Sequence, residues 1–188
     1  DTSLVTDMNT LFKLKITFNE NIGNWDTSSV GNMQGMFENA HVFNQDIGEW
    51  DTSNVTNMQG MFFMAKKFNQ DINTKIVNEG GNDEYIAWDV SAVTNMNLTF
   101  KSAERFNQDI RKWDTSIVIN MTRMFEGASA FSQNLSGWDV NKIPTAPDDF
   151  SLDANSSMVD PVWNTTGSYK FSNKDELVTA VNMYNGTT

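Results

Sequence analysis

Three aspartates are the first candidates for chemistry, because each lies at the same point of a recurring Asn-Gln-Asp-Ile stretch. They are Asp46, Asp71 and Asp109. Carboxylates can act as general acids and bases, and stacked Asp and Asn oxygens can bind calcium. Catalytic groups are normally unique, however, and Asn21 and Asn134 occupy the same position in other copies. We therefore interpret the aspartates as turn residues, with calcium binding as the alternative.

Other common catalytic and metal sites need residue types that the chain lacks. It contains no cysteine, and His41 is its only histidine. A Ser-His-Asp or Cys-His arrangement, a disulfide and a thiolate or histidine metal centre are therefore excluded or unsupported. We also find no unrepeated polar cluster of the kind that an active site needs. The sequence predicts neither enzyme activity nor a cofactor.

Sequons for N-glycosylation form a further set of candidate sites. Several, such as Asn120, fall where the repeat itself requires a polar residue, whereas Asn155, Asn164 and Asn185 fall in an irregular C-terminal part. We expect these last three to be the most accessible, and to carry glycan if the chain passes through a eukaryotic secretory route. The remaining candidates are Asn54, Asn97 and Asn134.

Most of these candidates lie within an internal repeat of 25 residues, which positions them. That step separates Trp25 from Trp50, and it separates Trp88, Trp113 and Trp138 from one another. A fixed period in this range is typical of stacked arrays, in which each unit buries its apolar face against its neighbours. We expect the tryptophans to form a shared core together with a phenylalanine column of the same period, namely Phe37, Phe62, Phe100 and Phe125.

The repeat divides residues 1–163 into six units. They are residues 1–25, 26–50, 51–88, 89–113, 114–138 and 139–163. The third unit holds an insertion within residues 73–87, which must loop out of the array. The sixth is degenerate and contains all three prolines. Because residue 1 is already in register with the repeat, we expect the chain to be part of a longer array.

Within a unit, the pattern predicts one short helix and one short strand. In the second unit, Val30, Met33, Phe37 and Ala40 recur at steps of three and four, which indicates an apolar helical stripe. An extended segment follows around Ile47. Stacking would place short parallel strands on one side and short helices on the other, as an α/β repeat solenoid. Residues 164–188 are expected to form a linker and an amphipathic helix, which caps the array or begins a following one.

The net charge of −11 limits the partners that the chain can have. A nucleic acid backbone needs a basic stripe, and an anionic membrane surface would repel this chain. No apolar run approaches the length of a membrane span, so we expect no direct membrane insertion. The expected partners are other proteins.

The stretch FNQDIGEWDTSNVTNMQGMFFMAKKFNQDI, residues 43–72, resembles the BspA-like leucine-rich surface repeat of bacterial and microbial surface proteins. The resemblance covers about residues 1–140. It implies a leucine-rich-repeat-like solenoid, exposed on or exported from the cell, within a long modular chain. Adhesion and surface structure are the roles that it suggests. The insertion, Thr99 and the proline-containing sixth unit depart from the family pattern.

The leading hypothesis from sequence is a non-enzymatic extracellular or cell-surface module with a structural or adhesive role. Its partners would be other proteins, including copies of itself in a filament or neighbouring repeats of a longer chain. One alternative is a specific ligand- or glycan-binding module that uses the insertion 73–87. Another is a calcium-stabilised rod. Phe63 and Tyr85 are the candidates for exposed aromatic contacts.

Overall fold

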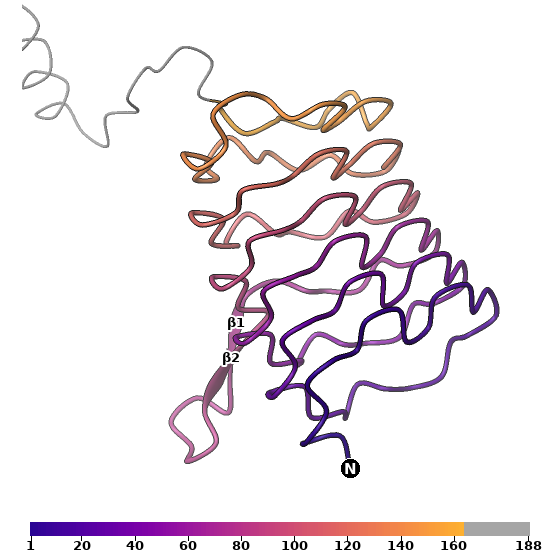
Figure 1. The fold of residues 1–188 in the computed structure, drawn as a ribbon, viewed down its shortest axis with the longest axis vertical. Coiled ribbons are helices and arrows are strands. Elements are labelled where there is room, and N and C mark those ends of the chain that lie inside the picture. Colours follow the sequence, from indigo (N-terminus) through magenta and orange to yellow (C-terminus); the bar gives the residue numbers. More distant parts are fainter. Residues whose placement is uncertain (164–188) are drawn as a thin grey trace, which may run out of the picture.

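The computed structural model describes residues 1–163, which form a stack of coils (Figure 1). The coils follow one another along one axis in sequence order, so the first and sixth units lie at opposite ends (Figure 1). The expected C-terminal helix lies outside the described residues, as do Asn164 and Asn185.

The expected α/β architecture is wrong for the described residues, which contain no helix. Their only strands are β1 (Lys75–Val77) and β2 (Tyr85–Ala87), which pair antiparallel as a hairpin inside the insertion. This hairpin projects from the side of the stack (Figure 1). The leucine-rich-repeat-like layers of short helices and parallel strands do not form. The expected strand around Ile47 is a turn, in which the Trp50 amide donates to the Ile47 carbonyl at 3.2 Å.

The segment expected to be helical, residues 30–43, is instead a run of overlapping turns. Every second amide donates to the carbonyl three residues earlier, at 2.9–3.2 Å. These donors are the amides of Met36, Glu38 and Ala40. The alternating amides donate instead to backbone carbonyls of the next coil, at 2.8–3.0 Å. These donors are the amides of Met33, Gly35, Phe37 and Asn39. Left-handed backbone at Gly35 (φ 58°) and Asn39 (φ 60°) prevents a continuous right-handed helix. The apolar spacing of three and four is therefore produced by turns.

Outside the insertion, the backbone bonds from one coil to the next keep one offset through the first five units. Met33 donates to the carbonyl of Asn57, and Phe100 donates to that of Met124, 24 residues ahead in each case. The coils also form parallel bridges, but each is a single residue wide, so no strand results. One set of bridged residues is Asp7, Asn32, Asn57, Asn95 and Asn120, and a further bridge joins Asn134 to Val159.

The core consists of aromatic columns that run through the stack. Phe62 lies 5.6 Å from both Phe37 and Phe100, ring centroid to ring centroid, and stacks on Phe68 of its own coil at 4.0 Å. Burial of such rings is the main apolar contribution to stability. The structure fully buries all four members of the expected phenylalanine column, and it buries Trp50, Trp88, Trp113 and Trp138.

Each interior tryptophan also bonds to the coil before it. The indole N–H of Trp50 donates to the Ile22 carbonyl at 3.2 Å, and that of Trp113 donates to the Ile72 carbonyl at 3.0 Å. Trp88 and Trp138 make the equivalent bond. Trp25, in the first coil, is only partly buried. A tryptophan thus fills the core and satisfies a buried backbone carbonyl of the neighbouring coil.

The sixth unit is out of register by one residue. Phe125 donates to the carbonyl of Phe150, an offset of 25 rather than 24. The Phe150 ring accordingly meets Phe125 edge-on, at 75°, instead of stacking on it. Pro144 and Pro147 lie just before this point, and proline has no amide to donate to the ladder. Phe150 therefore does not continue the phenylalanine column, although its sequence position matches it.

We predict that Gly60→Ala lowers the free energy of unfolding by about 1–2 kcal/mol, because a side chain is strained in left-handed backbone. Gly60 has φ 60°, and an added Cβ would meet nothing closer than 3.8 Å. Gly137→Ala is the matched control, since Gly137 has no positive φ and nothing within 4 Å of such a Cβ. Urea denaturation measures both variants. If both substitutions lowered the free energy of unfolding equally, the left-handed backbone at Gly60 would not be the cause of the destabilisation.

Candidate binding site at the hairpin

The three recurring aspartates are acceptors within turns. The Oδ1 atoms of Asp46, Asp71 and Asp109 each accept the amide two residues ahead, at 2.9–3.0 Å. Asn21 and Asn134 accept the equivalent amide, both at 3.0 Å. Among residues 1–163, no group of three or more His, Cys, Asp or Glu side chains could hold a metal ion. Each of these aspartates therefore stabilises its own turn by accepting a backbone amide, which an asparagine side chain can also do.

Asp109 differs from the other two because it also has a cationic partner. Arg111 donates from Nε and Nη2 to the carboxylate at 2.9 and 2.8 Å. These side-chain bonds, and then the backbone bond from Arg111, lower the pKa of Asp109 to about 2. The pair lies at the surface, where ion pairs contribute little to stability.

A ladder of asparagine side chains joins successive coils. The amide of Asn44 donates to Oδ1 of Asn19, that of Asn69 to Asn44, and that of Asn107 to Asn69, at 2.8–2.9 Å. Asx turns at the recurring Asp-Thr-Ser stretches add further local bonds, such as the 3.0 Å bond from the Ser28 amide to Asp26. The polar residues that recur are thus occupied in holding coils and turns together.

The described sequon asparagines differ in exposure. Asn54 and Asn134 are exposed, whereas Asn97 and Asn155 are partly buried, so Asn155 is not the most accessible of them. The Nδ2 atoms of Asn54 and Asn155 donate to backbone carbonyls of the preceding coil, at 2.7 and 3.1 Å. Glycosylation at these positions stays a prediction.

The two aromatic residues expected to be exposed are both partly buried. The ring of Phe63 lies 5.9 Å from Nζ of Lys101 in the neighbouring coil. The hydroxyl of Tyr85 donates to the Glu49 carbonyl at 2.6 Å, which ties the hairpin to the turn of the second unit. His41, also partly buried, has its Nε2 atom buried without a hydrogen-bond partner in the described part of the chain.

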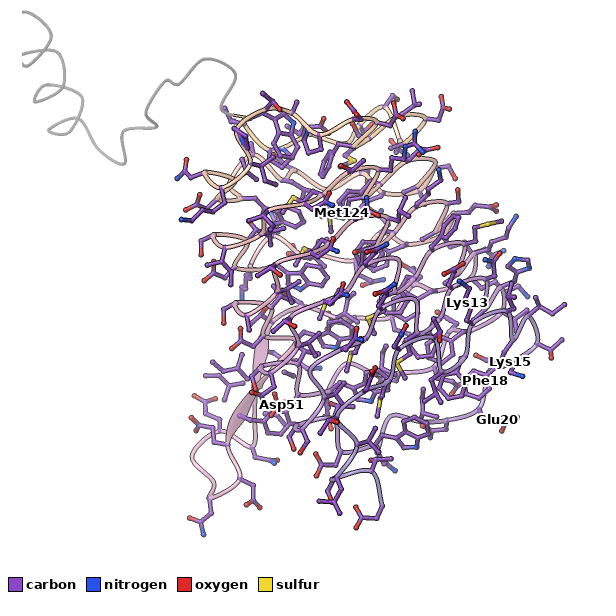
Figure 2. All side chains as sticks on the ribbon, viewed as in Figure 1. Lys13, Lys15, Phe18, Glu20, Asp51 and Met124 are labelled. Atoms are coloured by element: carbon purple, nitrogen blue, oxygen red, sulfur yellow. The ribbon has the colours of Figure 1, made fainter. Side chains whose placement is uncertain are left out.

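A cavity of about 360 Å³ lies between the hairpin and the turns of the first coils. The hairpin supplies Asn78, Asp83 and Tyr85 to its lining, and the turns supply Glu49 and Asp51. Asp51 lies beside the hairpin (Figure 2) and forms an antiparallel bridge with Ala87, the last residue of β2. The remaining lining residues are Gly23, Asn24, Trp25, Asp26, Thr27 and Ser28.

The cavity is acidic. Four carboxylates line it and no Lys, Arg or His does. Bonds from the side chain and backbone of Ser28 lower the pKa of Asp26, so that Asp26 stays ionised at neutral pH. Burial, followed by the charges of Glu49, Asp51 and Asp26, raises the pKa of Tyr85. The tyrosine hydroxyl therefore stays protonated at neutral pH, and the negative charge of the cavity comes from its carboxylates.

The family model described as "Mycoplasma protein of unknown function, DUF285" matches residues 1–84 and again residues 75–183. The chain belongs to this family. The two DUF285 matches overlap at residues 75–84, which hold β1 and the hairpin turn. No curated protein and no solved structure matches the chain significantly. No helix in residues 1–163 is long and apolar enough to cross a membrane.

Sequence reasoning placed the insertion but missed the cavity beside it. The roles of Trp25, Glu49 and Asp83 depend on how the hairpin folds back against two other turns. One signal was available, because the insertion lies between Ile72 and Trp88, where the second unit has only Gly48 and Glu49. An element inserted at that point must emerge beside the equivalent turn of the neighbouring coil.

We predict that Asp71→Asn leaves stability nearly unchanged, whereas Asp71→Ala lowers the free energy of unfolding by about 1 kcal/mol. Asparagine can still accept the Asn73 amide at 3.0 Å, and alanine cannot. Chemical denaturation with and without a calcium chelator measures both variants. A melting temperature that falls on chelation, together with a large loss in Asp71→Asn, would instead support calcium binding.

Proposed function

We propose that the chain is a non-enzymatic repeat module of the BspA-like type, which acts at the cell surface or outside the cell through contacts with other proteins. Its role would be structural or adhesive. Partners would include copies of itself or neighbouring repeats of a longer chain. The acidic net charge of −11 argues against nucleic acid as a partner.

One observation carries this proposal: the residues that recur are used in packing, turns and ladders, so the surface that varies is what remains for recognition. The Asn69 side chain, for example, accepts the amide of Asn107, and Asp71 accepts the amide of Asn73. A protein that only presents a binding surface needs no unique reactive group. The chain has no cysteine and a single histidine, so this role suits its composition.

The first coil supports contact with further repeats. Its apolar side chains Leu4, Leu14 and Ile16 are 89%, 63% and 53% exposed. Phe12 and Phe18, equivalent to fully buried rings elsewhere, are only partly buried. An apolar edge of this kind is stabilised when another coil stacks on it. Figure 2 shows Lys13, Lys15 and Phe18 on the side of the stack opposite the hairpin.

The cavity at the hairpin favours a second candidate, a module that binds a specific ligand through residues 73–87. The two candidates differ in what the hairpin does. Replacing residues 73–87 by Gly-Glu would give the third unit the spacing found between Ile47 and Trp50. This variant keeps the coils and removes the cavity.

Surface location and adhesion can be tested on cells of the source organism. We expect antibodies against residues 1–163 to label intact cells, and excess purified chain to reduce attachment of those cells to protein-coated surfaces. The chain after heat denaturation is the control. Labelling only after permeabilisation, with no competition, would contradict the proposal. If the variant without residues 73–87 folds but no longer competes, the second candidate is favoured.

A further inference from the structure

The bridges of the asparagine column end at Asn120, although a sixth coil follows. In the interior of the stack, two consecutive residues of each coil complete the ladder of the coil before it. Thr94 donates to the Thr56 carbonyl at 2.9 Å, and Asn95 accepts the Met58 amide at 3.0 Å. Each interior coil thus offers one carbonyl and, two residues later, one amide to the coil that follows.

In the fifth unit the same two groups, the Ile119 carbonyl and the Met121 amide, have no partner within residues 1–163. The residue 25 positions after Ile119 is Pro144, which has no amide to donate. The ladder resumes only where Arg123 donates to the Asp148 carbonyl at 3.0 Å, in the shifted register of the sixth unit. Residues 119–121 therefore form an open edge inside the stack.

A cavity of about 260 Å³ lies between this open edge and the sixth unit. Residues 119–122 line one side of it and residues 143–148 line the other. Met121 is fully buried, and buried backbone amides are paired in nearly all native proteins. An unpaired amide beside a cavity therefore marks a place that an acceptor from another molecule can fill. The two free groups are those of a main-chain ladder, which the backbone of an extended polypeptide complements.

The outer surface of the fifth unit is apolar at the open edge. Ile117 and Ile119 are 39% and 63% exposed, and the buried Val118 lies between them. The second, third and fourth units hold Ser29, Asn54 and Ala92 at the position of Ile117, and Gly31, Thr56 and Thr94 at that of Ile119. Two isoleucines thus replace small or polar residues where the ladder stops. Such β-branched side chains pack well against an extended apolar segment.

We propose that the open edge binds an extended segment of a partner protein, which adds to the ladder as a short strand. One residue of the segment donates its amide to the Ile119 carbonyl, and the next residue accepts the Met121 amide. Apolar side chains of the segment pack on Ile117 and Ile119. The inference deepens the proposed function and rests on it for the claim that the partner is a protein.

The size of the cavity and the bonds of the other coils favour a separate partner over a second copy of this chain. The cavity accommodates a short extended segment but not a coil of 25 residues. The equivalent segments of the interior coils are already bonded on both sides, as the amide of Thr94 and the carbonyl of Asn95 show. A folded second copy therefore has no interior segment that is free to enter.

Hydrogen exchange of the full chain tests whether the edge is open. Labelling with ¹⁵N-methionine isolates the amides of the eleven methionines, and Met121→Leu assigns the resonance of Met121. We expect this amide to exchange about tenfold or more faster than those of Met33, Met58 and Met96, which bond to the next coil. Protection of Met121 in the chain alone would show that the chain itself or a second copy fills the edge, and it would overturn the inference.

Peptide binding is then followed by the shift of the Met121 resonance. The probe is the capped, neutral peptide Ser-Val-Ile-Asn-Val-Ser, which we expect to shift this resonance saturably and to protect the amide from exchange. N-methylation of its three apolar residues removes the donors for the Ile119 carbonyl and should weaken binding by about tenfold or more. Equal binding of the two peptides would overturn the inference.

Two variants test the residues of the open edge. Ile117→Ser combined with Ile119→Thr introduces residues that other units hold at these positions, and it should weaken peptide binding by about fivefold or more. Pro144→Thr gives the sixth unit the amide that the fourth unit has at Thr94, so it should close the edge and abolish peptide binding. Unchanged peptide binding in either variant would contradict the inference.

Ile76→Thr is the matched control. It replaces an isoleucine that is 53% exposed on the hairpin and does not line this cavity, so we expect its effect on peptide binding to stay within about twofold. A loss equal to that of the double variant would overturn the inference. Unshifted amide resonances of Met33 and Met58 show that the variants remain folded. Peptide binding without surface location would refute the proposed function alone, and adhesion without peptide binding would refute only the inference.

Discussion

The structure depends on one constraint: in one segment of each coil, such as residues 33–39, alternate backbone amides must find their acceptors in the next coil, 24 residues ahead except at the sixth unit. Phe37 meets this constraint through Met61. Phe62 meets it through Thr99, and here the offset is 37 because 13 inserted residues intervene (37 − 13 = 24). The hydrogen bonds bring equivalent side chains into direct contact, so the aromatic columns stack at about one backbone spacing. A coil on its own would lack both these hydrogen bonds and the ring contacts with its neighbours.

The same constraint explains where recognition can occur. A side chain that recurs is positioned by its neighbours above and below, and most recurring polar groups are occupied by turns or ladders. The hairpin escapes the constraint because it leaves the stack between Ile72 and Trp88 and returns in register. Its residues are therefore able to differ from those of every other coil. The carboxylates and rings of the cavity gather beside it for that reason.

The sequence predicted which side chains are buried better than it predicted the backbone that buries them. The period of 25 placed Trp50 and Phe62 in the core correctly, because burial depends on register along the stack. The helix was wrong because a stripe at steps of three and four also arises from overlapping turns. Glycine or asparagine at Gly35, Asn39 and Gly60 marked the left-handed positions. That signal was weak, since Leu98 and Arg123 occupy the same kind of position. The cavity depended on contacts between distant parts of the chain, which no local pattern specifies.

The most direct test of this account is the removal of one whole coil, residues 89–113, which would join Trp88 to Asp114 in register. We measure urea unfolding by tryptophan fluorescence. The account predicts a cooperative transition with a lower free energy of unfolding, because one interface between coils is lost, and native emission typical of buried tryptophan. A shortened chain that unfolds without cooperativity, or whose tryptophans are exposed to water before denaturant is added, would contradict the claim that neighbouring coils are interchangeable partners.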